Sequence, residues 1–193
     1  IIRMINHKYK EIIKIENLLI TWERFLRGKR HKKDVIIFQA DLSANLADLH
    51  YSLADYSYSH GGYTAFNVSD PKPRNIHKAT VRDRVLHHLL YKELYPYFEK
   101  RFIYDSYSCR ENKGVHRALN RFKFFATIDH ETLLAIMERH IEDQGIIWLI
   151  RRVVSSFYTT RPGVGLPLGN LTSQLLVNGY MHEFDMFMKQ ELR

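Results

Sequence analysis

Apolar residues recur every three or four positions along most of this chain, a spacing that predicts amphipathic helices. The first such stripe covers residues 9–26 and ends before Gly28, and the second covers residues 34–53. A basic run of Arg, Lys and His separates the two and is typical of a solvated loop. Further helices are expected over residues 81–100, 114–122, 131–140, 146–156 and 170–190.

The helical spacing is interrupted at Gly61, and residues 63–68 are rich in aromatic and β-branched side chains, which predicts a strand. Residues 69–71 form a turn in this interpretation, and residues 72–76 return as the second arm of a hairpin. Pro73 restricts that arm to the edge of a sheet.

Two other stretches are expected to be irregular, namely residues 102–109 and the Pro- and Gly-rich residues 161–169. The chain has no internal repeat and no low-complexity tract. The expected fold class is therefore α+β, mostly helical with one β-hairpin.

The 193-residue chain is 45% hydrophobic and 26% charged, which disfavours disorder and a disulfide scaffold. No uncharged apolar run reaches about 18 residues, so a soluble protein without a membrane partner is expected. The lone cysteine, Cys109, excludes an internal disulfide and fits the cytoplasm. Because the chain begins at Ile1 without a charged and apolar leader, a trimmed N-terminus is expected rather than a secretory start.

The charge changes this picture: 29 Lys and Arg residues against 21 Asp and Glu residues give a net charge of +8. Such an excess attracts polyanions, so nucleic acid is the first partner to consider. A basic protein without any nucleic-acid role remains an alternative.

Familiar catalytic signatures are absent from the sequence, including phosphate-binding glycine loops and zinc motifs. His87 and His88 are adjacent and point in different directions from a helix, which disfavours a metal site. The segment that begins at Asp129 is interpreted as a helix start, with Asp129 or a neighbouring residue as its cap.

Three blocks of residues stand out in order along the chain. The first is Lys72-Pro73-Arg74 through His88, continued by residues 98–110 and Lys113-Gly114. The second runs from Lys123-Phe124-Phe125 to Leu134, and the third from Gly165-Leu166-Pro167-Leu168-Gly169 to Asp185. Together these blocks resemble the fingers and upper palm of prokaryotic reverse transcriptases over nearly the whole chain. The Leu-Gly-x-x-x-Ser-Gln form at residues 168–174 is most similar to the enzymes of diversity-generating retroelements.

The resemblance implies right-hand polymerase fingers followed by an incomplete palm. It divides the chain into an N-terminal helical region (1–60), fingers with the hairpin (61–122) and a partial palm (123–193). The implied activity is RNA-directed DNA synthesis by two-metal nucleotidyl transfer with Mg²⁺. The implied partners are an RNA template, a DNA or RNA primer and deoxynucleotides, and an accessory protein subunit is left open.

The resemblance also implies roles for individual residues. Lys72 and Arg74 match the cations that clamp the nucleotide triphosphate, and Arg has the fork geometry to do so. Leu168-Gly169 matches the loop under the templating pair. The full set of candidates for nucleotide binding is Lys72, Arg74, Phe125, Leu168 and Gly169, and the candidates for the nucleic-acid path are Arg82, Arg84 and Arg110.

Alternatives stand beside these roles. Lys72 and Arg74 are otherwise solvated strand charges, and Phe125, the implied steric gate against ribonucleotides, is otherwise a core residue. The arginines Arg82, Arg84 and Arg110 would otherwise pair with Asp83 or Asp105.

One part of the family pattern is missing. In the family, the first metal-binding aspartate stands four residues before the first Phe of the Phe-Phe pair. In this chain that position is Asn120. About 20 residues are inferred to be missing between Phe122 and Lys123, from the spacing in the family. The chain also ends at Arg193, before the position of the other carboxylates. It is therefore expected to be inactive on its own, as a piece of an active enzyme. The alternative is a catalytically dead RNA-binding module or remnant.

The residue at position 168 leads to a prediction about copying accuracy. Many relatives carry Gln where this chain has Leu168, and in the retroelement enzymes a branched residue there goes with low fidelity. We expect Leu168→Gln to lower the error rate of the full-length enzyme, because the amide restores a hydrogen-bonding contact. Sequencing of cDNA copied from a defined RNA measures this rate, and an unchanged error spectrum would contradict the prediction.

Overall fold

The computed structural model describes residues 4–69, 73–101 and 125–190. It is a mostly helical α+β fold with one β-hairpin, so the expected fold class is confirmed. The elements in order are α1 (Tyr9–Ile12), α2 (Ile15–Phe25), α3 (Lys33–Ala40), α4 (Leu42–Ala54), β1 (Tyr63–Val68), β2 (Arg74–Ala79), α5 (Val81–Glu99), α7 (His130–Glu138), α8 (Gln144–Val154) and α9 (Leu171–Gln190).

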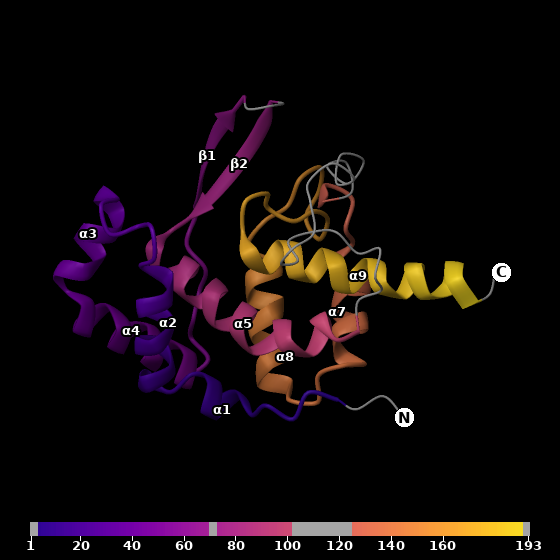
Figure 1. Ribbon diagram of the computed structural model, residues 1–193, viewed down its shortest axis with the longest axis horizontal. Helices are drawn as coiled ribbons and strands as arrows, with labels where there is room; N and C mark the ends of the chain where they lie inside the picture. The colour runs from indigo at the N-terminus through magenta and orange to yellow at the C-terminus, as the bar shows by residue number, and fades with distance from the viewer. Residues whose placement is uncertain (1–3, 70–72, 102–124, 191–193) are drawn as a thin grey trace.

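Helix α5 is the element around which the others pack. It contacts α2, α3 and α4 on the N-terminal side and α9 on the C-terminal side, and α7 packs against both α8 and α9. Its buried residues, which include Val85, Leu86, Leu89 and Leu90, belong to a hydrophobic core cluster that runs from Ile5 to Val177. The hairpin projects from this helical body (Figure 1).

The hairpin is antiparallel, with Tyr63 opposite Ala79 and Val68 opposite Arg74. The first strand has the predicted bounds, whereas the second covers residues 74–79 instead of the predicted 72–76. The reason is the register, because each of the six residues of β1 needs a partner on the returning strand. The hairpin thus reaches into the sequence immediately before α5.

Both N-terminal helices that were predicted as continuous are broken. Residues 9–26 divide at Ile13 and Lys14, since α1 packs on α8 whereas α2 packs on α4 and α5, and a straight helix cannot face both. Residues 34–53 divide at Asp41 (φ −118°), where Asn45 Nδ2 donates to the Phe38 carbonyl at 2.9 Å and so satisfies the end of α3.

The other helix predictions fit the structure to within two residues. Helix α5 begins and ends as expected, and Asp129 caps α7 by accepting a hydrogen bond from the Thr132 amide at 2.8 Å. Residues 161–169 contain no helix, as expected. The predictions for residues 102–109 and 114–122 lie outside the described residues, and the division into three regions stays a prediction.

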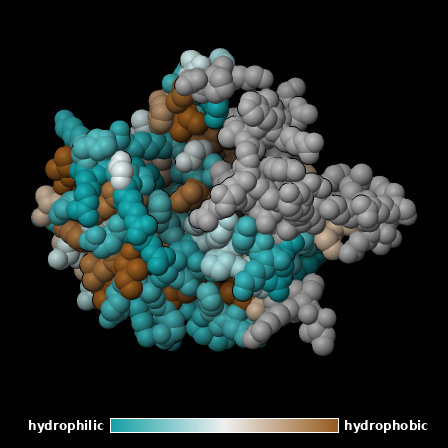
Figure 2. All heavy atoms as spheres, viewed as in Figure 1, coloured by the Kyte–Doolittle hydropathy of each residue, from teal (hydrophilic) through white to brown (hydrophobic). Residues whose placement is uncertain are grey.

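The surface is consistent with a folded basic chain. The face shown in Figure 2 is mainly hydrophilic, with separate hydrophobic patches over the N-terminal helices. Within the described ranges, no helix is both long and apolar enough to cross a membrane.

Asp83, in the first turn of α5, is a carboxylate at only 1% exposure. Its oxygens accept hydrogen bonds from the Tyr58 hydroxyl at 2.7 Å, the Gly61 amide at 3.0 Å and the Thr80 hydroxyl at 2.5 Å. Thr80 in turn caps the helix by accepting from the Asp83 amide. These bonds compensate the burial of the charge and fix the segment before β1 against the start of α5.

We expect Asp83→Ala to lower the free energy of unfolding by about 3–5 kcal/mol, because it leaves the Tyr58 hydroxyl and the Gly61 amide buried without their acceptor. Urea denaturation of the chain measures the change. Asp48→Ala is the matched control, since that carboxylate is 72% exposed and pairs with Arg82 at the surface; it should cost about 1 kcal/mol or less. An equal loss of unfolding free energy in the two variants would contradict the stabilising role of the Asp83 hydrogen bonds.

Candidate functional site

The candidate site begins where residues 168–170 meet the outer edge of β2. The His77 amide donates to the Leu168 carbonyl at 3.0 Å, and Asn170 Nδ2 donates to the His77 carbonyl at 3.0 Å. Both backbone groups of one strand residue are thus satisfied by a loop 91–93 positions further along the chain. These two hydrogen bonds hold the loop against the edge of β2.

Gly169 allows this close approach. Its φ of +96° is a conformation that side chains disfavour, and a Cβ added there would lie 2.7 Å from Ile76 Cγ2. The backbone of Gly169 therefore packs directly on the Ile76 side chain, which leaves a bare peptide surface beside the hairpin.

Arg74 lies at the start of β2, opposite Val68, and is partly buried. Because side chains alternate along a strand, Arg74 and Ile76 share one face of the hairpin. The structure thus places Arg74 on the face that Gly169 contacts. Lys72, its predicted companion, lies outside the described residues.

Phe125 is linked to the same loop through the backbone, because its carbonyl accepts from the Leu166 amide at 2.8 Å. Its side chain is 7% exposed and belongs to the hydrophobic core cluster. Leu168 is partly buried against that cluster. The steric gate stays a prediction, and the present packing of the ring is that of a core residue.

Arg82 and Arg84 are engaged in ion pairs with the N-terminal helices. Arg82 Nε lies 3.1 Å from Asp48 Oδ2, and Arg84 pairs with Asp34. The alternative that they pair with a carboxylate thus holds, but with other partners than Asp83, whose oxygens accept from Tyr58, Gly61 and Thr80. Their contact with nucleic acid stays a prediction, and Arg110 and Asp105 lie outside the described part of the chain.

Asp34 connects three elements through charge. Lys78 Nζ on β2 lies 2.7 Å from its Oδ2, and Arg84 on α5 pairs with the same oxygen. Burial raises the pKa of Asp34, but the hydrogen bonds and charges of Lys78 and Arg84 outweigh it and hold the pKa below its usual range. The base of the hairpin is thus tied to α3 by one carboxylate that Lys78 and Arg84 share.

A pair of buried histidines lies at the base of the hairpin. The Nε2 atoms of His60 and His87 are 3.1 Å apart, and the Tyr63 hydroxyl lies 3.3 Å from the same His60 nitrogen. Burial, together with His60, lowers the pKa of His87 to about 3, so its ring is neutral at pH 7. The two rings stack at a centroid distance of 5.2 Å and serve packing.

Among the described residues, no group of three or more His, Cys, Asp or Glu side chains is placed to hold a metal ion. His87 and His88 fit this finding, since each belongs to a different environment: His88 lies over Phe25, on the side of α5 that faces α2. The donor set that Mg²⁺ requires, several carboxylate oxygens around one position, is not offered by the described part of the chain.

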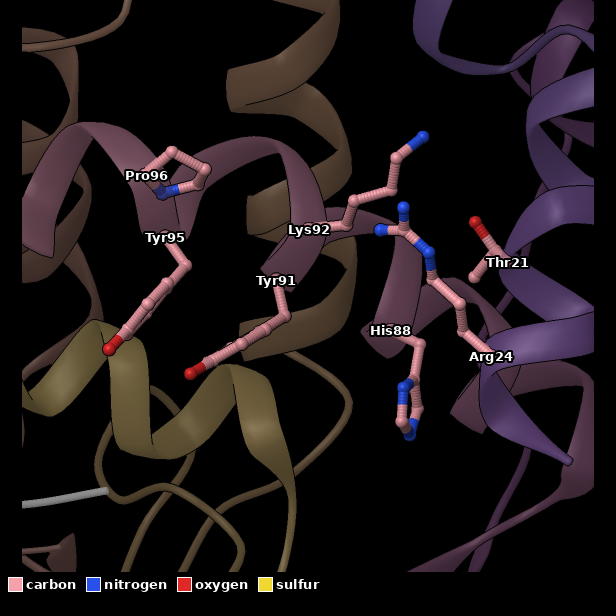
Figure 3. Close-up of a pocket in the computed structure, with 7 residues that line it drawn as sticks. All are labelled: Thr21, Arg24, His88, Tyr91, Lys92, Tyr95 and Pro96. Atoms are coloured by element: carbon pink, nitrogen blue, oxygen red, sulfur yellow. The ribbon is translucent and has the colours of Figure 1, made fainter. Parts of the chain in front are cut away.

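A groove of about 270 Å³ lies between α2 and α5 (Figure 3). None of the predicted site residues lines it, and Lys92, one of the two cations in its lining, is bound to Asn17 at 3.3 Å and Glu93 at 3.0 Å. The lining residues are Thr21, Arg24, His88, Tyr91, Lys92, Tyr95 and Pro96. The groove is therefore separate from the site at the hairpin.

No protein-family model matches the chain. It is 30% identical over 129 residues to an uncharacterized 91 kDa protein in a cob intron of Schizosaccharomyces pombe and 26% identical over 148 residues to a putative COX1/OXI3 intron 1 protein of Saccharomyces cerevisiae. It is also 23% identical over 148 residues to protein YkfC of Escherichia coli. These alignments cover 56%, 63% and 63% of the chain but only 16%, 18% and 39% of the relatives. The chain thus spans a minor part of the length of these proteins.

A solved structure, described as a partial Cas6-RT-Cas1–Cas2 complex, shares the fold. It matches with a TM-score of 0.55 and 16% identity over 95% of this chain and 35% of the other. With the intron proteins and YkfC, this match shows distant similarity to the reverse transcriptases of introns and retroelements. At this identity the structural match concerns the fold alone.

Sequence reasoning missed the residues that assemble the site, namely Asn170, His77 and Ile76. A signal was present for Asn170, because an Asn between a Gly and a helical stretch is typical of a helix start. Its actual bond, to a strand carbonyl 93 positions earlier, has no local signature.

We expect Gly169→Ala to destabilise the chain by about 1–3 kcal/mol, because the added Cβ meets Ile76 and the backbone angle becomes strained. Thermal unfolding followed by circular dichroism measures the effect. Gly62→Ala is the control, since nothing lies within 4 Å of a Cβ there and its φ is not positive. A control variant that loses as much stability would show that the close approach at Gly169 is not the cause.

Proposed function

We propose that this chain is the fingers and part of the palm of an RNA-directed DNA polymerase of the diversity-generating retroelement kind. The whole protein would copy an RNA template from a DNA or RNA primer with deoxynucleoside triphosphates. The observation that carries the proposal is the pairing of residues 168–170 with β2, which brings Gly169 to the hairpin face that holds Arg74. The similarity to intron proteins and the shared fold support it.

The residues of this chain would act on the nucleotide by binding and orientation. The Arg74 guanidinium would donate two parallel hydrogen bonds to phosphate oxygens, with Lys72 as a second cation. Gly169 would lie under the base pair being formed, as the resemblance of Leu168-Gly169 implies. The position requires glycine, because any side chain there would collide with Ile76. Phe125, joined to the same loop through Leu166, would limit the space at the sugar.

Nucleotidyl transfer of this kind uses Mg²⁺ held by carboxylates. The described residues do not fit that role, because they offer no cluster of acidic side chains. The chemical step would therefore need carboxylates other than those described here, and nothing in the described part of the chain supplies them.

The second candidate function is an RNA-binding module without catalysis. The net charge of +8 and the lack of a metal-ligand cluster among the described residues favour it. Such a module would bind RNA chiefly through its phosphates, with strong salt dependence, and would extend no primer.

Primer extension on an RNA template by the full-length protein separates the two functions. We expect extension, and we expect Arg74→Ala to raise the KM for deoxynucleotides roughly 10- to 100-fold, because charge-assisted hydrogen bonds to the phosphates are lost. Arg74→Lys should recover part of the loss, since it keeps the charge but not the fork. Arg139→Ala, an exposed arginine paired with Glu183, is the control. Salt-sensitive RNA binding without extension would instead support the module.

A further inference from the structure

The loop that follows α8, residues 155–167, lies against the hairpin on the side opposite the Gly169 contact. The ring centroid of Phe157 is 4.7 Å from that of His77 and 5.5 Å from that of Tyr63, both edge-to-face. Tyr63 is further held by Ser156, whose Oγ lies 2.9 Å from the Tyr63 hydroxyl. The position of this loop is thus fixed relative to both strands.

The loop is also fixed along its own length. The Thr159 hydroxyl donates to the Ala126 carbonyl at 2.7 Å, and the Gly165 amide donates to the Ile128 carbonyl at 2.8 Å. His130 Nε2 lies 2.7 Å from the Gly165 carbonyl. Side chains presented by this loop therefore lose little backbone freedom when they bind a ligand.

Tyr158 and Arg161 are the side chains that this fixed loop presents to solvent. Tyr158 is 59% exposed, although its neighbours Phe157 and Thr159 are both engaged. Arg161 is exposed as well, and after the hydrogen bonds from Thr132 its charge is one of the smaller causes that lower the pKa of the nearby Asp129. An aromatic face and a guanidinium stand three positions apart in a loop that continues directly into residues 168–170.

We propose that Tyr158 and Arg161 bind an unpaired RNA strand along the loop that leads directly into residues 168–170 of the candidate site. The ring of Tyr158 stacks on a base, and Arg161 neutralises a phosphate of the same strand. This inference rests on the proposed function and adds a location for the single-stranded part of the template.

The chemistry of the surface favours a nucleic acid over a protein partner. Tyr158 is the one large exposed apolar side chain in the loop 155–167, all of which the structure describes, so this loop offers too little apolar area for a protein interface. Exposed aliphatic side chains lie elsewhere, on α3, where Ile36 and Ile37 are 54% and 64% exposed. They have no flat ring on which a base could stack. An exposed aromatic face three positions from an exposed guanidinium suits base stacking with phosphate contact.

The test compares two RNA ligands by fluorescence anisotropy: a duplex with an unpaired extension of about eight nucleotides and the same duplex with blunt ends. We expect the full chain to bind the extended duplex more tightly than the blunt one. Tyr158→Ala should lower the ratio of these two affinities about tenfold. Tyr158→Phe should retain it, because stacking needs the ring and not the hydroxyl. Tyr51→Ala is the matched control, since Tyr51 is 68% exposed on α4.

Arg161→Ala gives a second, independent readout. It should reduce the slope of log affinity against log salt for the extended duplex by about 0.7, the value for one phosphate contact on a single strand. The proposal is overturned if the wild-type chain shows no preference for the extension, if Tyr158→Ala weakens both duplexes equally, or if Tyr51→Ala has the same effect. Primer extension by the full-length protein decides the proposed function separately, so either can fail alone.

Discussion

The buried carboxylate of Asp83 is the interaction on which the arrangement of this fold depends. A charge at 1% exposure persists only where its oxygens are fully hydrogen-bonded, and here the donors come from Tyr58, Gly61 and Thr80. Those residues lie just before β1 and just after β2, so one side chain fixes both ends of the hairpin to α5. The hairpin can project from the body because its base is held at this point.

The candidate site depends in turn on that fixed base. With the hairpin held, the backbone of His77 presents its amide and carbonyl at a defined place, and residues 168–170 bind to both. Gly169 is thereby held beside the strand that carries Arg74, and Phe125 is joined to the same loop through the Leu166 amide.

Local signals in the sequence predicted much of the fold but little of the site. The first strand and α5 were correct because strand-forming residues and the Thr80 cap act within a few positions. The breaks at residues 13–14 and at Asp41 were missed because distant packing partners cause them. The ion pairs of Arg82 and Arg84 were missed for the same reason, since no local pattern identifies Asp48 or Asp34 as the partner.

The pairing of residues 168–170 with His77 has a consequence for solubility. A two-stranded hairpin that projects from its domain exposes unpaired backbone groups, and another chain can add to them as an extra strand. Here the outer edge of β2 is already covered at His77, by a segment that ends in a helix and cannot extend the sheet. The same contact that brings Gly169 to the hairpin thus protects that edge against self-association.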